Sequence, residues 1–237
     1  RFNNGGIRAI SSTTGEVAWS DLTAVQSEGE NHGSVKSIAH DNGTVCVGVQ
    51  PGSQFGSPPW AFAGYDAETG QQLWYIERDL ELDGVNPEVA VSDGICFAAI
   101  DNHYMVIDAR SGTVQTEVEQ SNTARRVYGA VDGIVLILRN GQLHDADIGT
   151  GETRWQFDVD FYSPPSSLDG STFWFADGGK LHEADVQSGS VRERQSLNVG
   201  DTSLTSGVVS DTDGLAVTDE TMFVTTEDAT LRALERQ

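Results

Sequence analysis

The stretch FAGYDAETGQQLW, residues 62–74, decides the fold of this chain, because its pattern returns as LHDADIGTGETRW at residues 143–155. Each stretch has an apolar segment, an aspartate, a Thr-Gly turn and a second segment that ends in tryptophan. Altered forms of the pattern begin at residues 7, 104 and 181. Short β-segments that recur about every 40 residues are typical of propellers and related repeat arrays. We therefore interpret the 237 residues as one repeat structure.

Between these stretches the sequence alternates short apolar segments with turn dipeptides. In one repeat the segments PEVAVS, GICFAAI, HYMVIDA and TVQTEV follow one another, and the dipeptides include Asp93-Gly94, Asp132-Gly133 and Asn140-Gly141. Such dipeptides supply the positive φ angles that tight hairpins need. The pattern predicts an all-β fold, a β-propeller of four-stranded antiparallel blades with almost no helix.

The repeats also predict how much of a ring the chain contains. Residues 1–237 are expected to form a single domain with six blades, four complete and two partial. The chain begins with Arg1 and starts and ends inside repeat units, which suggests a piece of a longer protein whose ring has six to eight blades. Unpaired edge strands at both ends would promote aggregation.

Charge excludes one class of partner. Asp and Glu number 36 against 14 Lys and Arg, which gives a formal net charge of -22. No basic stripe is present to contact phosphates, so we expect no nucleic-acid binding. Dispersed acidic residues repel one another in dilute buffer and are screened at molar salt. The composition favours a salt-adapted, halophilic protein; an ordinary acidic secreted domain is the alternative.

No apolar run of 18 residues occurs, so no transmembrane segment is expected in this chain. No signal peptide is present either. We expect an extracellular or cell-surface location, and a cytoplasmic one stays open.

The recurring pattern consists of a small apolar residue, Asp, any two residues, Thr or Ser, Gly, any three residues and Trp. This pattern resembles the PQQ-like repeat. That repeat forms propeller blades in quinoprotein dehydrogenases and in non-enzymatic scaffold proteins. The residues that carry the resemblance are Gly15, Trp19, Asp66, Gly70, Trp74, Asp108, Gly112, Asp147, Gly151, Trp155, Asp185 and Gly189. The resemblance implies that each tryptophan packs against the turn of the neighbouring blade. Thr116 and Glu193 stand where tryptophan is expected, so two such contacts should lack it.

The resemblance raises the question of a quinone cofactor with calcium. No segment can be assigned residue by residue to such a site, so we expect no catalytic, cofactor-binding or metal-binding residues. Residues 145–152 and 211–220 superficially resemble acidic cation loops but do not complete the calcium pattern. His144 and His182 occupy the same strand position in successive blades, about 10 Å apart, too far to share a metal easily.

Two cysteines lie on equivalent second strands of adjacent blades, Cys46 in VCVGV and Cys96 in ICFAA. Equivalent strands of neighbouring blades lie about 10 Å apart, whereas a disulfide requires Cα atoms within about 7 Å. We therefore predict two buried free thiols.

The repeats differ chiefly in their connections. Three long ones, residues 21–34, 50–60 and 78–87, should emerge on the face opposite the Thr-Gly turns. Loops on a rigid scaffold often carry binding function. Phe55, Trp60 and Tyr162 are candidate partner anchors on this face, because aromatic side chains are enriched in interface hot spots. The alternative is that Phe55 and Trp60 fold back over the blade.

Together these observations predict a non-catalytic scaffold that binds a protein or a small ligand of unknown identity. The alternative is a fragment of a quinone- or metal-dependent oxidoreductase. A carbohydrate-active or hydrolytic propeller is a third possibility, and it would need paired carboxylates that face the channel.

Overall fold

The computed structural model describes residues 6–21, 34–50, 60–78, 86–100, 103–119, 124–159, 166–177, 180–196, 215–217, 221–225 and 231–235. Within these ranges every regular element is a β-strand and none is a helix. The all-β prediction is therefore confirmed. Phe55 and Tyr162, and the acidic residues Asp211 and Asp213, lie outside the described residues.

The strands form six antiparallel sheets, which we number as blades I to VI in chain order. Blade I contains β1 (Ile7–Ile10) and β2 (Val17–Asp21). Blade II contains β3 (Ser34–Asp41), β4 (Thr44–Gln50), β5 (Trp60–Asp66) and β6 (Gln72–Arg78). Blade III contains β7 (Glu88–Ser92), β8 (Ile95–Ile100), β9 (His103–Asp108) and β10 (Val114–Glu119).

Blade IV contains β11 (Ala124–Val131), β12 (Ile134–Arg139), β13 (Gln142–Asp147) and β14 (Thr153–Asp158). Blade V contains β15 (Ser166–Asp169), β16 (Thr172–Asp177), β17 (Lys180–Asp185) and β18 (Val191–Ser196). Blade VI contains β19 (Leu215–Val217), β20 (Thr221–Thr225) and β21 (Leu231–Glu235). Each sheet is a simple meander, so strands that follow one another in sequence pair with one another.

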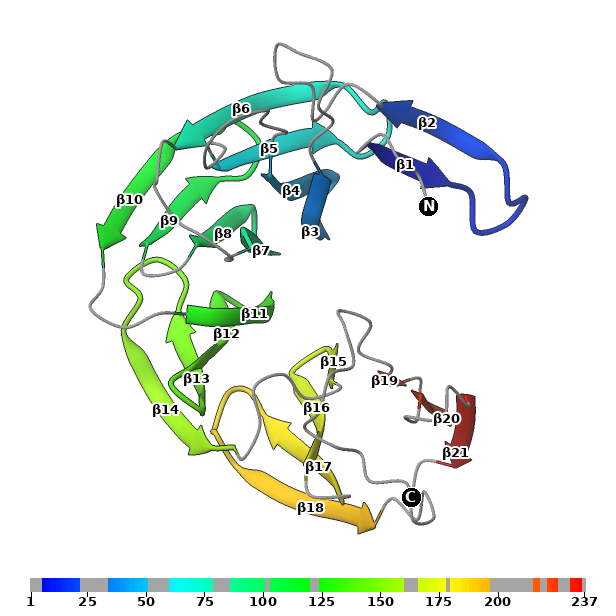
Figure 1. Ribbon diagram of the computed structural model, residues 1–237, viewed down its shortest axis with the longest axis vertical. Coiled ribbons are helices and arrows are strands. Elements are labelled where there is room, and N and C mark those ends of the chain that lie inside the picture. The colour runs from blue at the N-terminus through cyan, green and yellow to red at the C-terminus, as the bar shows by residue number, and fades with distance from the viewer. Residues whose placement is uncertain are drawn as a thin grey trace.

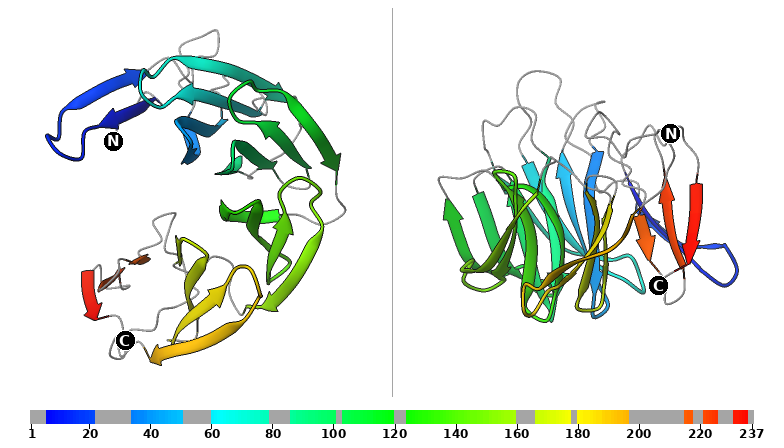
Figure 2. Two further views of the ribbon diagram at one scale, coloured as in Figure 1. Left: turned by 180° about the vertical axis from the view of Figure 1, so that it is seen from behind. Right: turned by 90° about the horizontal axis from the view of Figure 1, so that it is seen from below.

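The blades stand side by side along an open arc, with blade I at one end and blade VI at the other (Figure 1). The first strands β3, β7, β11 and β15 lie nearest the centre, and the fourth strands β6, β10, β14 and β18 form the outer rim. The views in Figure 2 show the same single row of sheets from behind and from below. The propeller prediction is confirmed, with four complete blades and two partial ones among the described strands.

Tight hairpins between strands follow from the turn dipeptides. Asn42, Asp93, Asp132 and Asn140 have φ angles between 45° and 53°, and each precedes a glycine with φ between 72° and 77°. Two successive residues with positive φ define the turn whose twist matches paired strands. Blade V differs, because Asp169 pairs with Thr172 and the two turn residues are Gly170 and Ser171. Its turn is therefore displaced by one residue relative to the other blades.

The core lies between blades, and both faces of blades II, III and IV are covered by their neighbours. On β4, Val45 and Val47 pack with Ile7 of blade I, whereas Cys46 packs with Val89 of blade III. Successive side chains of a strand point to opposite faces of its sheet. A strand covered on both faces therefore reads as a continuous apolar run, as in IVLILR of β12.

Candidate functional site

Four of the Thr-Gly and Ser-Gly turns in the described residues are built around an aspartate that opens the turn, and Ser11 takes this position in blade I. One oxygen of Asp66 accepts hydrogen bonds from the Thr69 amide and the Thr69 hydroxyl, both at 2.9 Å. The Asp66 carbonyl accepts the Gly70 amide at 2.8 Å. The Thr69 amide, an Arg110 hydrogen bond and the Thr69 hydroxyl lower the pKa of Asp66 to about 2. The pKa values of Asp108, Asp147 and Asp185 are lowered mainly by hydrogen bonds within their own turns.

The tryptophans of the repeat join each blade to the next one. The indole N–H of Trp19 donates to the Ala67 carbonyl, that of Trp74 to the Ala109 carbonyl, and that of Trp155 to the Val186 carbonyl, at 2.8–2.9 Å. Each acceptor lies in the Thr-Gly turn of the following blade. An indole combines a large apolar surface with one donor, so it can pack and bond at the same contact.

The turn glycine is required at this contact for space as well as for conformation. A Cβ on Gly70 would lie 2.5 Å from the Trp19 ring, and one on Gly112 would lie 2.4 Å from Trp74. A Cβ on Gly189 would lie 2.5 Å from Trp155. All three glycines also have φ near 70°. In these three contacts, a tryptophan on one blade therefore requires a glycine in the turn of the next blade.

A different residue makes the contact between blades III and IV. Thr116 replaces the tryptophan there, and Tyr104 of β9 fills the space instead. A Cβ on Gly151 would lie 2.3 Å from the Tyr104 hydroxyl oxygen, and that hydroxyl donates to the Thr150 carbonyl at 3.4 Å. The contact predicted to lack a tryptophan is therefore occupied by an aromatic side chain from the neighbouring strand.

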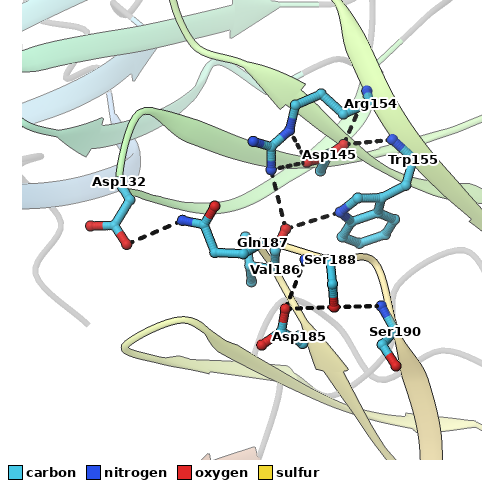
Figure 3. Close-up of polar contacts among 9 residues, drawn as sticks. All are labelled: Asp132, Asp145, Arg154, Trp155, Asp185, Val186, Gln187, Ser188 and Ser190. Atoms are coloured by element: carbon cyan, nitrogen blue, oxygen red, sulfur yellow. Dashed lines mark hydrogen bonds and ion pairs between the residues drawn. The ribbon is translucent and has the colours of Figure 1, made fainter.

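The contact between blades IV and V has an additional ion pair, between a buried aspartate and a partly exposed arginine (Figure 3). Asp145 has a fully buried side chain and accepts the Arg154 guanidinium at 2.6 Å. It also accepts the backbone amides of Arg154 and Trp155, at 3.1 and 2.8 Å, where the pairing of β13 with β14 shifts register. Arg154 and Trp155 both donate to the Val186 carbonyl, so the pair adds a second link between the blades.

Two further contacts use arginines on the outer strands. Arg78 of β6 donates two hydrogen bonds at 2.9 Å to Glu117 of β10, which joins blades II and III. Within blade V, Glu183 accepts Arg192 at 2.5 Å and also accepts Arg194. Arg78, Arg192 and Arg194 therefore each bind an acidic partner within the same fold.

The acidic loop at residues 145–152 has a structural role. Asp145 binds Arg154, and one oxygen of Asp147 accepts the Gly149 and Thr150 amides and the Thr150 hydroxyl. Across the described part of the chain, no group of three His, Cys, Asp or Glu side chains could hold a metal ion. His144 is buried, and its pKa is lowered by desolvation and by nearby Arg139, whereas His182 stacks on Phe175 with ring centroids 5.0 Å apart.

Trp60 is not a partner anchor. Its side chain is 1% exposed and belongs to the core between blades II and III, with Phe62, Val89 and Cys96. The first residue of β5 points into the sheet interface, so the apolar ring packs there instead of meeting solvent. Of the three aromatic candidates, Phe55 and Tyr162 fall in segments that the structure does not describe, and they stay predictions.

Comparison with known proteins identifies the family. The family model described as outer membrane protein assembly factor BamB matches residues 2–156, 61–202 and 139–237, which together span nearly the whole chain. The chain belongs to this family of PQQ-like repeat propellers. Among curated protein sequences, none matches significantly.

Solved structures support the fold. BamB from Moraxella catarrhalis has a TM-score of 0.56 at 16% identity, over 99% of this chain and 65% of that one. This chain thus spans just under two thirds of the BamB chain. The mitotic checkpoint complex contains a chain with a TM-score of 0.63 at 11% identity, over 98% of this chain and 70% of that one. A protein of unknown function from Bacteroides caccae scores 0.55 at 13% identity, over 98% and 86%.

Sequence reasoning missed the residues that replace or reinforce the motif. Tyr104 opens its repeat at a position that is only apolar in the other repeats, so only the absence of tryptophan at residue 116 pointed to a substitute. The sequence does contain a signal for the ion pair, because Arg154 immediately precedes the motif residue Trp155 and Asp145 lies two residues before the motif residue Asp147.

In the described ranges, no helix is long and apolar enough to cross a bilayer.

Proposed function

We propose that this chain is a non-catalytic scaffold of the cell envelope or cell exterior that binds another protein. The observation that carries the proposal is the match of nearly the whole chain to a family model described as an assembly factor. An assembly factor works by contacting other proteins, and a rigid propeller is suited to present loops to them. The alternative is that the same loops bind a small ligand instead of a protein.

The contacts of the repeat residues support this proposal. Each described turn aspartate binds its own turn, and each described motif tryptophan binds the next blade. These side chains stabilise the arc and leave recognition to residues outside the repeat. The long connections at residues 21–34, 50–60 and 78–87 are the places where this chain departs from its own pattern.

The test compares aromatic residues on and off the proposed binding face. Phe55→Ala and Tyr162→Ala remove the two remaining candidate anchors, and Tyr75→Ala is the matched control. Tyr75 is 41% exposed on β6, an outer strand far from the centre of the arc. Quantitative mass spectrometry of proteins bound to the tagged chain in cells should find a partner lost with the first two variants and retained with the control.

The partner is then purified and its affinity measured directly by calorimetry. A loss of roughly tenfold or more in affinity for either anchor variant would support the proposal, because hot-spot truncations cost more than about 1 kcal/mol. Equal binding by all variants would contradict the proposed face. Quinone- and calcium-dependent dye reduction by the purified chain would favour the oxidoreductase alternative.

A further inference from the structure

The two cysteines lie in the same interface between blades II and III. Both side chains are fully buried and belong to one apolar cluster, together with Trp60, Val89 and Ile107. The prediction of two buried, free thiols is confirmed. The expectation that they occupy equivalent strand positions is wrong, because both side chains face the same interface between blades II and III.

A one-residue offset explains why they meet. Cys46 is the third residue after the turn glycine Gly43, whereas Cys96 is the second residue after Gly94. A shift of one residue along a strand moves a side chain to the opposite face of its sheet. Cys46 therefore faces forward, toward blade III, and Cys96 faces back, toward blade II.

Neighbouring blades follow the same rule. In blade IV the second residue after the turn glycine, Val135, packs in the cluster with blade III, and the third, Leu136, packs in the cluster with blade V. In blade II the second residue, Val45, packs toward blade I. The two thiols are thus directed into one interface from its two sides.

The Cys46 side chain also affects the Cys96 thiol in this shared cluster. Interaction with Cys46, with burial as the second cause, raises the pKa of the Cys96 thiol well above its usual range. The Cys96 thiol is therefore protonated, and both side chains are shielded from solvent once the blades have packed.

We propose that Cys46 and Cys96 are a disulfide-forming pair that joins blades II and III when the chain folds in an oxidising compartment. The oxidant is a disulfide donor, either a small-molecule or a protein disulfide. One cysteine thiolate attacks a donor sulfur and releases one donor thiol, and the other cysteine attacks the resulting mixed disulfide and releases the second. Two protein S–H bonds are replaced by one S–S bond, and the donor disulfide is reduced to two thiols.

The reaction belongs to folding because the native pair is inaccessible. Thiol exchange requires a thiolate and an approach path for the donor, and the packed interface provides neither. A bond between these residues closes a loop of roughly 50 residues, which restricts the unfolded chain and stabilises the folded one. The inference does not depend on the proposed function.

The test uses the unmodified chain. It is unfolded and reduced, then refolded either with a reduced and oxidised glutathione mixture or with a reductant, and alkylated after renewed unfolding. We expect the oxidised sample to have lost two hydrogens, to resist alkylation and to yield a linked peptide pair containing Cys46 and Cys96. Its thermal midpoint should exceed that of the reduced sample by roughly 5–10 °C.

A register-shifted variant provides the control. Combining Val45→Cys with Cys46→Ala moves the first thiol by one residue, to the face of β4 that is turned toward blade I. This variant should refold without an internal disulfide. Two alkylatable thiols in the oxidised wild-type chain would overturn the proposal, as would a midpoint no higher than that of the reduced chain. Equal disulfide formation in the shifted variant would refute the facing geometry.

Discussion

Gly112 and Gly94 belong to the same blade and have nearly the same backbone conformation, with φ of 73° and 75°. They differ in their surroundings, since a Cβ on Gly112 would overlap the Trp74 ring and a Cβ on Gly94 would meet nothing within 4 Å. We predict that Gly94→Ala costs about 1–2 kcal/mol from backbone strain alone. Gly112→Ala should cost about 1–3 kcal/mol more, because the ring must also move. Chemical denaturation of both variants measures the difference, and equal losses would contradict the space requirement.

At the residue scale, the sequence predicted what the repeat determines and missed what depends on orientation. The contacts of Trp74 and Trp155 follow from a phrase that recurs, so pattern alone located them. Trp60 and Cys96 fall outside that phrase, and their positions depend on which face of a strand they occupy. Face is settled by a single residue of register, which insertions in the turns obscure. The displaced turn at Gly170 and Ser171 shows how such a shift occurs.

At the element scale, the contact between blades III and IV uses Tyr104 of β9 where the repeat would use a tryptophan on β10. We predict that Thr116→Trp destabilises the chain by about 1–3 kcal/mol, because two aromatic side chains would compete for one space. Tyr104→Ala should cost about 3–5 kcal/mol by leaving that space empty. The double variant should be more stable than the sum of the two losses implies.

A double-mutant cycle from urea denaturation measures this coupling. Additive losses would show that residue 116 and Tyr104 do not share one packing site. Thr116→Ser serves as the control, because it alters the same position without adding an aromatic ring.

The turn aspartates predict how the blades respond to acid. Hydrogen bonds lower the folded-state pKa of Asp66 to about 2 and also lower those of Asp108, Asp147 and Asp185. A group with a lowered folded pKa stabilises the fold above its unfolded value, near 4, and that contribution is lost as pH falls through the folded value. Stability should therefore decrease between about pH 4 and pH 2.

Molar KCl is the appropriate solvent for this measurement, because protonation also relieves repulsion among the acidic residues and screening removes that opposing effect. Denaturation midpoints between pH 6 and pH 2 give the profile. Asp147→Asn should be less stable at pH 6 and should show a shallower decline. An unchanged slope in this variant would rule out a contribution from its turn.

At the scale of the whole molecule, the repeat predicts the architecture but not the function. The proposed function depends on the comparison with known protein families. Five copies of one phrase predicted blades, their order and their antiparallel strands, because each copy must bury both faces against its neighbours. The proposed binding face could not be derived in this way, since the connections at residues 50–60 and 160–165 obey no repeat. The residues that recur in every repeat are those that packing between blades requires. A partner affects only the residues that it touches, and these need not recur.

The net charge of -22 leads to the last prediction, which concerns the entire surface. Like charges spread over all blades repel one another more strongly in the compact state than in the unfolded chain. We propose that the chain is salt-adapted and expect its thermal midpoint to rise steadily between 0.1 and 2 M KCl, as the Debye length shortens from about 10 Å toward 3 Å. Sucrose at matched osmolality is the control, because it stabilises by exclusion without screening charge. A midpoint that rises equally in sucrose, or that does not respond to KCl, would assign the acidic surface to a role other than salt adaptation.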